Sequence, residues 1–572
     1  MTHTEMKEKT IIYAVLPRLF GNMKNRCVQN GSLEENGCGK MADFNAHVLK
    51  EIKDLGATHI WYIGLIEHAT KTNYTNYGIE PDHPAVVKGK AGSPYAIKDY
   101  YDIDPDLAKS VPDRMEEFQN LVTRTHKAGL KMIIDFIPNH VARQYHSDAK
   151  PEGVIDLGEQ DDSSLSFSPK NNFYYIPGQH LGGEIDLHYG AAKAYDEYPA
   201  KATGNDRFDA SPTITDWYET VKLNYGVDYM NGRTNHFDPI PDTWHKMLDI
   251  LMFWVSKGID GFRCDMAEMV PVDFWHWAIP QVKEHNPSII FIAEIYNPGA
   301  YRNYLFYGHF DYLYDKVGLY DTLRNITCGK ESCKVLTERW QSLDGIQTQM
   351  LNFLENHDEQ RIASDFFAGN ALAAIPAMIV TATMNTNPVM IYFGQELGER
   401  GMDDEGFSGK DGRTTIFDYW TVDSIYRWNN QGKFNDERLN KTEINLRAFY
   451  TTLLNLCNEE KAIREGTFFD LTYANLEGWQ FNEHKQFAYL RKHEDELLLI
   501  VVNFGDNPVR TAINIPRHAF DYLDFPPLSV EAKELLSGNI EHIAMMPDHA
   551  TQLQLEGRSG KILKIQLYEE VK

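Results

Sequence analysis

The stretch RMEEFQNLVTRTHKAGLKMIIDFI (114–137) joins an amphipathic segment to an apolar one, with Gly129 near the junction. We expect a helix over 114–130 that ends near Gly129, because glycine readily adopts the backbone conformation that terminates helices. The run 131–137 predicts a buried strand. A helix that leads directly into an apolar strand is typical of a parallel sheet wrapped by helices.

The same alternation extends on both sides of this stretch. Phe44, Val48, Ile52 and Leu55 lie at helical spacing and predict a helix over 42–56. Other strands are predicted at 11–20, 59–66, 259–266, 288–294, 350–358 and 388–396, and other helices at 243–258, 371–384 and 445–460. Together these segments predict an α/β domain built around a parallel sheet.

Two parts of the chain break the alternation. Residues 141–235 show no long periodic helix and are too many for an ordinary loop, which indicates a small irregular inserted domain. Beyond about residue 465, the runs QFAYLRKH, ELLLIVVNFG and LKIQLY predict strands alone. We therefore expect a main domain (1–140 and 236–464), an inserted domain (141–235) and a C-terminal antiparallel β domain (465–572).

The charge and hydropathy of the chain disfavour two classes of binding partner, nucleic acid and membranes. The 82 acidic and 56 basic residues give a formal charge of −26, which disfavours nucleic acid and anionic membrane surfaces. No window approaches the roughly 18–20 apolar residues that a membrane span requires. The polar N-terminus lacks the apolar core of a signal peptide, so we expect a cytoplasmic protein as written, or a periplasmic or secreted one if a leader was trimmed.

The six cysteines are sparse for 572 residues, and none has zinc-site spacing. Cys264 lies in an apolar run and is predicted to be a buried thiol. Cys27 with Cys38, and Cys328 with Cys333, are close enough in sequence to pair, but nothing in the sequence decides whether they do. The oligomeric state is equally open.

Four strand ends carry polar clusters that a folded core would not retain. The segments are DFIPNH (135–140), GFRCDMAEM (261–269), FIAEIYN (291–297) and ENHDEQR (355–361). Each follows an apolar run, so its charged groups should emerge at the C-terminal edge of the parallel sheet, where (β/α)₈ barrels build their active sites. Converging carboxylates cost several kcal/mol in repulsion and desolvation, which indicates that they serve a function.

These four segments resemble, in order, the signature regions of the α-amylase family of glycoside hydrolases (glycoside hydrolase family 13). The resemblance implies a (β/α)₈ TIM barrel with an irregular domain B after its third strand and a C-terminal antiparallel β-sandwich. It also implies retaining cleavage of α-1,4-glucosidic bonds in starch, glycogen or maltooligosaccharides. Asp265 would be the nucleophile, Glu294 the acid/base, and Asp358 the third carboxylate, which stabilises the transition state.

The chemistry of a retaining glycosidase fits these positions. Such enzymes need two carboxyls about 5–5.5 Å apart, one a nucleophile and one a proton donor. Asp265 follows Arg263 by two residues, so both point to the same face of the strand, and the cation favours an ionised Asp265. Glu294 follows the apolar run SIIFIA, which favours the protonated form that a donor needs.

Further site residues follow from the resemblance. His140 and His357 match histidines that hydrogen-bond the sugar in the central subsite. Asp135 is expected to orient Arg263 from the neighbouring strand.

For several aromatic and basic residues the sequence allows two interpretations. Tyr95 resembles a tyrosine stacked beneath the sugar, although a core tyrosine is equally consistent with the sequence. Arg413 either faces the sugar chain or forms a structural salt bridge. The run 173–175 (Phe-Tyr-Tyr) is better explained by packing of the inserted domain than by an outer sugar platform.

The sequence departs from the family at a structural calcium site. Asn139 fits one of the expected ligands, but Lys222 stands where an Asp is expected and Met269 where a His is expected. A methionine sulfur does not suit a hard cation, and a lysine ammonium can offset the same acids. We therefore expect no cofactor and no calcium at this site, with Asn139 a ligand only if calcium is present.

Two alternatives to hydrolysis remain from the sequence. A transglycosylase or a trehalose-synthase-type isomerase shares the same carboxylates and differs in whether water or a sugar hydroxyl attacks the intermediate. A non-catalytic glycan-binding module on the same fold is a more distant alternative. Substrate length, endo or exo action and tolerance of α-1,6 branches are not encoded in these motifs.

Overall fold

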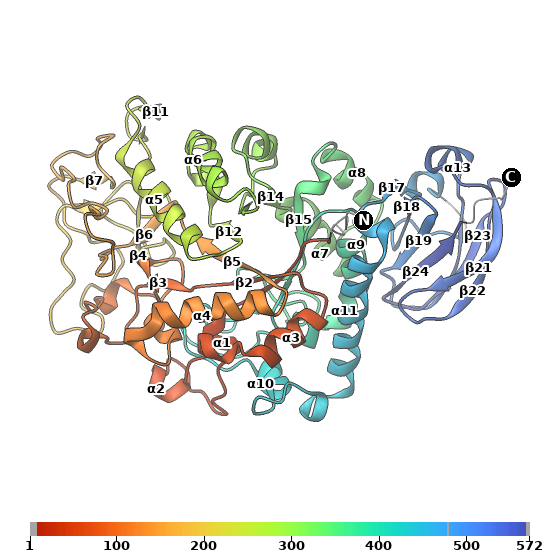
Figure 1. The fold of residues 1–572 in the computed structure, drawn as a ribbon, viewed down its shortest axis with the longest axis horizontal. Helices are drawn as coiled ribbons and strands as arrows, with labels where there is room; N and C mark the ends of the chain where they lie inside the picture. Colours follow the sequence, from red (N-terminus) through yellow and green to blue (C-terminus); the bar gives the residue numbers. More distant parts are fainter. Residues whose placement is uncertain (1–7, 478–479, 568–572) are drawn as a thin grey trace.

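A computed structural model describes residues 8–477 and 480–567, and in this part of the chain eight parallel strands close a barrel. Around the barrel the strands follow one another in chain order, and the last pairs with the first. They are β1 (Ile11–Val15), β2 (His59–Tyr62), β5 (Lys131–Phe136), β12 (Gly261–Cys264), β13 (Ile290–Ala293), β14 (Tyr312–Tyr314), β15 (Met350–Phe353) and β16 (Val389–Tyr392). The predicted (β/α)₈ barrel is confirmed, and it occupies the middle of the molecule (Figure 1).

Helices surround the barrel and cover its apolar strands. The longer ones are α3 (Ala46–Asp54), α4 (Arg114–Lys127), α5 (Asp242–Ser256), α6 (Val272–His285), α8 (Val335–Ser342), α9 (Ile375–Thr383) and α11 (Lys441–Glu459). Shorter ones are α1 (Pro17–Phe20), α2 (Leu33–Asn36), α7 (Asp321–Thr327), α10 (Asp423–Asn429) and α12 (Lys461–Arg464), whereas α13 (Arg517–Leu523) packs in the core of the C-terminal domain. The stretch 114–137 folds as predicted: α4 buries Phe118, Leu121 and Val122, and Gly129 follows it with a φ of 74°.

Two details of the barrel differ from the sequence-based prediction. The first strand ends at Val15 instead of residue 20, because Pro17 occupies the first turn of α1 and cannot continue a central strand. Strand β14 was not predicted at all. It has only three residues and lies between two π-helical segments, Asn303–Tyr307 and Lys316–Tyr320, so it carries no alternating pattern.

The segment that follows β5 is irregular, as predicted, and holds only short antiparallel pairs among its described residues. These are β6 (His140–Ala142) with β9 (Thr220–Lys222), β7 (Tyr175–Ile176) with β8 (Ala200–Lys201), and β10 (Val227–Asp228) with β11 (Thr234–Asn235). It lies at the opposite end of the molecule from the C-terminal sheets (Figure 1). A second segment outside the barrel follows β2 and forms the antiparallel pair of β3 (Ile66–His68) and β4 (Ile97–Ile103).

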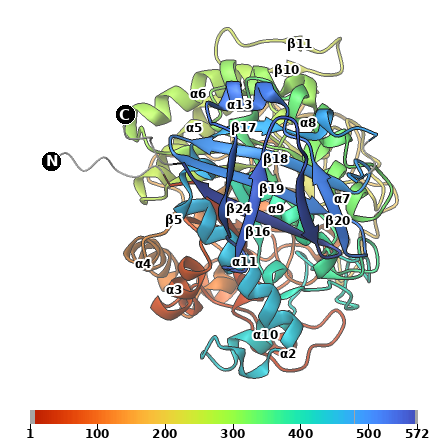
Figure 2. The same cartoon turned by 90° about the vertical axis from the view of Figure 1, so that its right-hand side faces the viewer.

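The C-terminal part forms two antiparallel sheets, and this confirms the predicted β domain. The larger sheet has the order β17 (Thr467–Asp470), β18 (Gln486–His493), β19 (Glu496–Asn503), β24 (Ser559–Gln566), β21 (Leu528–Glu534), β22 (Ile540–Met545). The smaller sheet pairs β20 (Val509–Ile513) with β23 (Thr551–Leu555). Figure 2 shows the two sheets in front of the barrel. The exact domain boundaries, at 140, 235 and 464, stay predictions.

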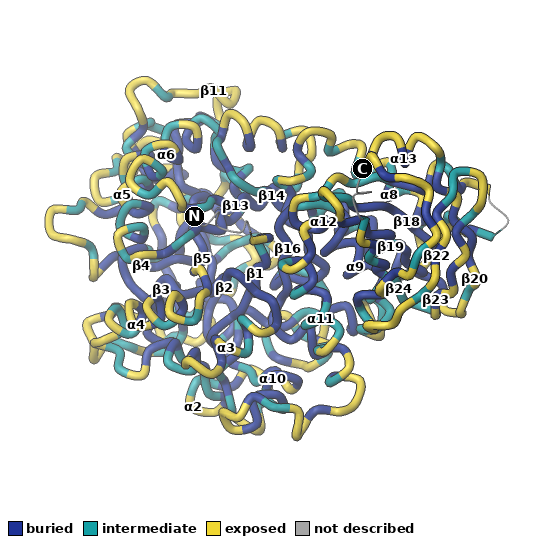
Figure 3. Tube along the Cα trace, turned by 45° about the vertical axis from the view of Figure 1, so that its right-hand side comes forward, coloured by how far each residue is buried: buried dark blue, intermediate teal, exposed yellow. Residues whose placement is uncertain are grey.

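Strand β19 is buried on both faces, and this explains its unbroken apolar run. Leu498, Ile500 and Val502 belong to the hydrophobic core of the barrel, whereas 497, 499 and 501 belong to the separate core of the C-terminal domain. Side chains alternate between the faces of a strand, so a strand covered on both faces needs apolar residues throughout. Figure 3 shows β18 and β19 as buried segments at the junction with the barrel.

All six cysteines are free thiols, and Cys264 is buried as predicted. Neither of the two pairs that sequence proximity left open is therefore bonded. Across residues 8–477 and 480–567, the structure has no helix with the length and apolarity needed to cross a membrane.

Arg491 of β18 fastens the C-terminal sheet to the barrel and gives a stability prediction. Its buried guanidinium donates to the backbone carbonyls of Ala462, Met384, Ile463 and Gly466 at 2.7–3.0 Å. We expect Arg491→Leu to reduce the free energy of unfolding by about 3 kcal/mol, because buried carbonyls without a donor cost about 1–3 kcal/mol each. Urea or thermal unfolding measures this loss. Arg510→Leu, at an exposed position of β20, is the matched control, and equal stability of the two variants would contradict the assignment.

Candidate active site

The polar ends of β5, β12, β13 and β15 converge at one edge of the barrel, as the sequence predicted. A cavity of about 330 Å³ opens there. Its walls include the predicted Asp265, Glu294, Asp358, Tyr95 and His140. The structure therefore gathers the three predicted carboxyls around one cavity.

Arg263 lies beneath this cavity and organises its carboxyls. Its guanidinium is 2.7 Å from Asp265 Oδ1, 2.8 Å from Glu294 Oε2 and 3.6 Å from Asp135 Oδ1. Its Nε also donates to the Tyr314 hydroxyl at 3.2 Å. Asp135 of β5 is the register partner of Arg263 on β12, which explains why the predicted contact between neighbouring strands forms. A buried cation of this kind is stable only when acids surround it.

Asp265 contacts Arg263 as predicted, but its proton affinity differs from the expectation. Burial raises the pKa of Asp265 well above its usual range; Arg263 lowers it, and the nearby Glu294 and Asp358 raise it further. Arg263 favours the ionised form of Asp265, as expected, but burial and the two neighbouring carboxyls outweigh this effect. Three carboxyls around one guanidinium favour retention of a proton within the cluster.

Glu294 accepts hydrogen bonds on both carboxyl oxygens. Oε2 accepts from the Met266 backbone N–H at 2.8 Å, in addition to its ion pair with Arg263. Oε1 accepts from the Tyr296 hydroxyl at 2.6 Å. The sequence predicted an apolar setting for this carboxyl, and the structure instead surrounds it with donors. The apolar run before Glu294 packs within the barrel wall and does not surround the carboxyl group itself.

Asp358 differs from Asp265 in the direction of its pKa shift. Desolvation opposes its ionisation, but His357, followed by Arg263 and Arg413, lowers its pKa to about 2. His357 Nε2 lies 3.0 Å from Asp358 Oδ2 and 2.6 Å from the Tyr95 hydroxyl. The rings of Tyr95 and His357 also stack, with centroids 5.1 Å apart. Tyr95 therefore both packs inside the barrel end and borders the cavity, so the two interpretations of this residue are compatible.

His140 stands beside Asp265, with its Nε2 4.0 Å from Asp265 Oδ2. Burial, followed by the charge of Lys222, lowers the pKa of His140 to about 3, so the ring is neutral at ordinary pH. A neutral imidazole can donate one hydrogen bond and accept another. Asp135 is buried too, and burial raises its pKa to about 6 although Arg263 acts in the opposite direction.

Two of the alternatives left by the sequence are clarified by these positions. Arg413 pairs with Asp411 at 2.9 Å and donates to the backbone carbonyl of Asp358 at 2.6 Å, and it does not line the cavity. This favours a structural salt bridge over a direct contact with substrate. Residues 173–175 are all buried, as expected for packing of the inserted segment.

Several residues that line the cavity were not predicted from the sequence. Trp217 lies in the inserted segment, with its ring 5.2 Å from that of His140, and Phe417 lies in the loop between β16 and α10. Lys88 and Glu219 form an ion pair of 2.9 Å at the cavity wall. Loops without a period offer no signal for such residues. Tyr296, which also lines the cavity, is the exception, because it lies two positions after Glu294 in the motif FIAEIYN.

Lys222 occupies the centre of the group that the family pattern relates to calcium. Its ammonium contacts the Asn139 side-chain oxygen, lies 2.7 Å from Asp206 Oδ1 and donates to the Met269 carbonyl at 3.1 Å. The pairing of β6 with β9 sets Lys222 opposite His140 and so brings it to Asn139. Asp206 was not predicted; it lies in the inserted segment, where no motif marks it.

Comparisons with known proteins agree with this geometry. The sequence model of the alpha amylase catalytic domain matches residues 15–442. Alpha-amylase 3 of Dictyoglomus thermophilum is 23% identical over 464 residues, which cover 77% of this chain and 80% of that protein. Neopullulanase 2 of Thermoactinomyces vulgaris is 23% identical over 315 residues, which cover 54% of this chain and 45% of that protein.

Solved structures show the same fold over almost the whole chain. A maltogenic alpha-amylase, AmyB of Thermotoga neapolitana, has a TM-score of 0.63 at 19% identity, covering 98% of this chain and 99% of that one. The alpha-amylase of Geobacillus thermoleovorans has a TM-score of 0.63 at 18% identity, with the same coverage. Since the catalytic-domain model spans residues 15–442, the chain belongs to the alpha-amylase family and is a glycoside hydrolase or transglycosylase.

Proposed function

We propose that this protein cleaves α-1,4-glucosidic bonds in starch, glycogen or maltooligosaccharides with retention of configuration. The observation that carries the proposal is the Arg263 guanidinium, which contacts both Asp265 and Glu294 at 2.7 and 2.8 Å beside the cavity. Retaining glycosidases need a nucleophile and an acid about 5–5.5 Å apart, and a shared guanidinium favours such a short separation. The names of several relatives, which include amylases and a neopullulanase, support α-glucan as the substrate.

In the proposed reaction Asp265 attacks the anomeric carbon while Glu294 protonates the departing glycosidic oxygen. The bond from that carbon to the leaving sugar breaks, and a glycosyl–aspartate ester forms. Water then gives a proton to Glu294 and attacks the same carbon, which releases Asp265. The mechanism requires that Glu294 carries a proton and that Asp265 is ionised when the sugar is bound.

Asp358 and the residues around it have a different proposed part. Its low pKa keeps it anionic throughout, so it can stabilise positive charge that develops on the sugar ring. His140 and His357 offer hydrogen-bonding nitrogens at the same end of the barrel. Tyr95 and Trp217 line the cavity, and aromatic side chains suit the apolar C–H faces of a sugar.

Substitution of the two carboxyls tests the catalytic assignment. We expect Asp265→Asn and Glu294→Gln each to reduce reducing-sugar release from amylose by at least about 10³-fold, because each removes a group that the covalent mechanism requires. Glu338→Gln, at an exposed position of α8, should keep full activity. Unchanged activity of Asp265→Asn would refute the mechanism, and absence of sugar release by the unmodified protein would favour the alternative of a non-catalytic glycan-binding module.

The products formed from maltoheptaose separate hydrolysis from transfer. Both reactions pass through the same glycosyl–aspartate, and they differ in whether water or a sugar hydroxyl attacks it. We expect chromatography to show only chains shorter than the substrate. Longer chains would instead assign a transglycosylase, and trehalose formed from maltose would assign an isomerase. Parallel digests of amylose, pullulan and cyclodextrin define the tolerance of branches and ring substrates.

We further propose that Lys222 replaces calcium between the inserted segment and the barrel. Its ammonium contacts Asn139, Asp206 and the carbonyl of Met269, which together offer the oxygen ligands that calcium prefers. We expect Lys222→Asp to bind one more calcium ion per chain than the unmodified protein, as measured by calorimetry after chelator treatment. Calcium binding by the unmodified protein that Asp206→Asn abolishes would contradict this proposal.

A further inference from the structure

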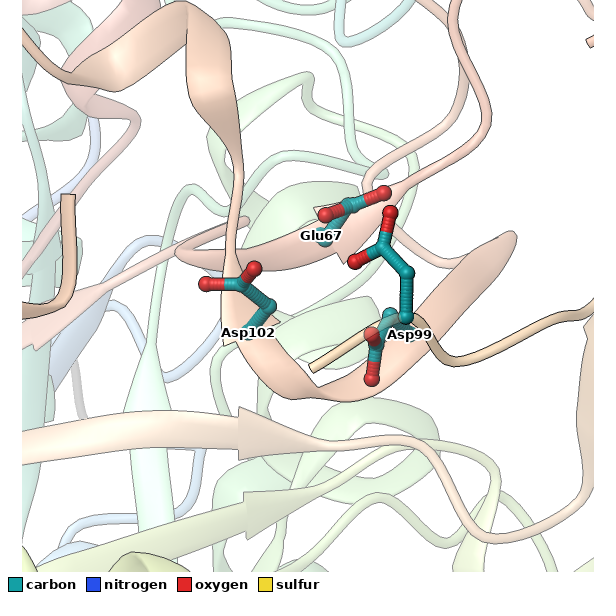
Figure 4. Close-up of side chains that lie close together, drawn as sticks. Glu67, Asp99 and Asp102 are labelled. Carbon is teal, nitrogen blue, oxygen red and sulfur yellow. The ribbon is translucent and has the colours of Figure 1, made fainter. Parts of the chain in front are cut away.

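Four carboxyl groups converge in a place that has no part in the proposed reaction. They belong to Glu67 of β3, Asp99 and Asp102 of β4, and Asp148, which follows β6. One oxygen from each lies within 4.8 Å of the others, and none of the four residues lines the catalytic cavity. Figure 4 shows the carboxyl of Glu67 beside that of Asp99, with the carboxyl of Asp102 on the other side.

The local backbone forces this approach. Glu67 is the register partner of Asp99 in the antiparallel pair β3–β4, and the register shifts on each side of Glu67. Like charges at directly opposed positions destabilise a strand pair, and bulges commonly redirect side chains at functional positions. The sheet thus keeps an arrangement that its own pairing energy disfavours.

Glu67 itself has no compensating partner in the described part of the chain. Its side chain is only 1% exposed, and its buried Oε2 accepts no hydrogen bond. A buried carboxylate without a donor is costly, because it has lost water and gained nothing in return. This unpartnered oxygen is the observation that distinguishes the cluster from an ordinary group of surface acids.

Two of the other carboxyls, those of Asp99 and Asp102, are held by hydrogen bonds or an ion pair. Asp99 accepts hydrogen bonds from the Ser147 hydroxyl at 2.6 Å, from the Ala149 N–H at 3.0 Å and from the Tyr101 N–H at 2.8 Å. Asp102 is paired with Arg114. Lys98, the next residue to Asp99, is directed to Asp82 at 3.2 Å instead. One paired guanidinium therefore faces four carboxyls, and the cluster keeps an excess of negative charge.

We propose that Glu67, Asp99, Asp102 and Asp148 bind a calcium ion. Calcium takes six to eight oxygen ligands at about 2.3–2.6 Å, so ligands on opposite sides of the ion are about 4.6–5.2 Å apart. Oxygens that lie within 4.8 Å of one another suit this spacing. Asp148 is exposed, which leaves room for water ligands. Magnesium demands stricter octahedral geometry and releases water reluctantly, so four carboxylates on three segments suit calcium better.

The proton affinities of these groups agree with an uncompensated cluster. Burial, followed by the charges of Asp99, Asp102 and Asp148, raises the pKa of Glu67 to about 10. Burial also raises the pKa of Asp99 to about 6, against its three hydrogen bonds. Both shifts have burial as their largest cause, and a neighbouring carboxyl adds to each, in agreement with the geometry of the cluster.

The ion would connect the strand pair β3–β4 to the start of the inserted segment. Asp148 lies between Ser147 and Ala149, both of which already bond to Asp99. The site differs from the one held by Lys222, whose contacts are Asn139, Asp206 and Met269. The inserted segment would thus be fixed twice, by an ammonium ion in one place and by calcium in the other.

Calorimetric titration of the full chain after chelator treatment tests the site. We expect one calcium ion per chain, and we expect Glu67→Gln to weaken the affinity at least about tenfold by removing a ligand charge. Among the described residues the Glu67 side chain has no hydrogen-bond partner, so this substitution should not disturb folding. Glu338→Gln is the matched control and should bind as the unmodified protein does. No calcium binding at about 1 mM, or unchanged affinity in Glu67→Gln, would overturn the proposal.

Thermal unfolding supplies a second readout. At the same calcium concentration, the Tm of the unmodified protein and of Asp206→Asn should rise more than that of Glu67→Gln. In chelator, Glu67→Gln should be at least as stable as the unmodified protein, because it relieves repulsion. Loss of the calcium effect in Asp206→Asn would move the ion to the Lys222 group and overturn the assignment. An equal rise of Tm with magnesium would overturn the choice of calcium.

Discussion

The buried guanidinium of Arg263 is the interaction on which the rest of the active site depends. It contacts acids from three strands, Asp135 of β5, Asp265 at the end of β12 and Glu294 at the end of β13. A cation with this degree of burial requires several anions, and each of these carboxyls requires the cation in turn. The charge balance therefore fixes three strand ends relative to one another. It also sets how many protons the carboxyls retain, because a single cation cannot neutralise three buried acids.

The same rule of charge balance applies elsewhere in the molecule with different solutions. Lys222 satisfies the oxygens around Asn139 with a side chain, so the chain carries its own cation there. Around Glu67, four carboxyls meet and the nearby Lys98 is directed to Asp82. The oxygens around Lys222 are neutralised by a cation of the chain itself, whereas the excess negative charge around Glu67 is not. This difference is what separates a structural ion pair from a candidate metal site.

The sequence predicted most of the fold and the chemical centre of the site. Parallel strands with apolar runs and polar ends, such as 131–140, follow a period that can be counted, and Arg263 and Asp265 share a face by simple alternation. Strand β14 and Trp217 could not be predicted, since a strand of three residues and an irregular segment have no period. The proton affinity of Asp265 was also beyond sequence reasoning. It depends on how closely Glu294 and Asp358 approach, which is a property of the closed barrel.

Strand β24 has a consequence for the order in which the protein assembles. It lies in the middle of the larger C-terminal sheet, between β19 and β21, although it is the last strand along the chain. Ile562 of this strand belongs to the hydrophobic core of the barrel, whose first strand begins at Ile11. During synthesis, part of the apolar surface of the barrel therefore stays uncovered until residue 562 has left the ribosome. A nascent chain in that state depends on protection from aggregation, because exposed apolar surface associates with other chains.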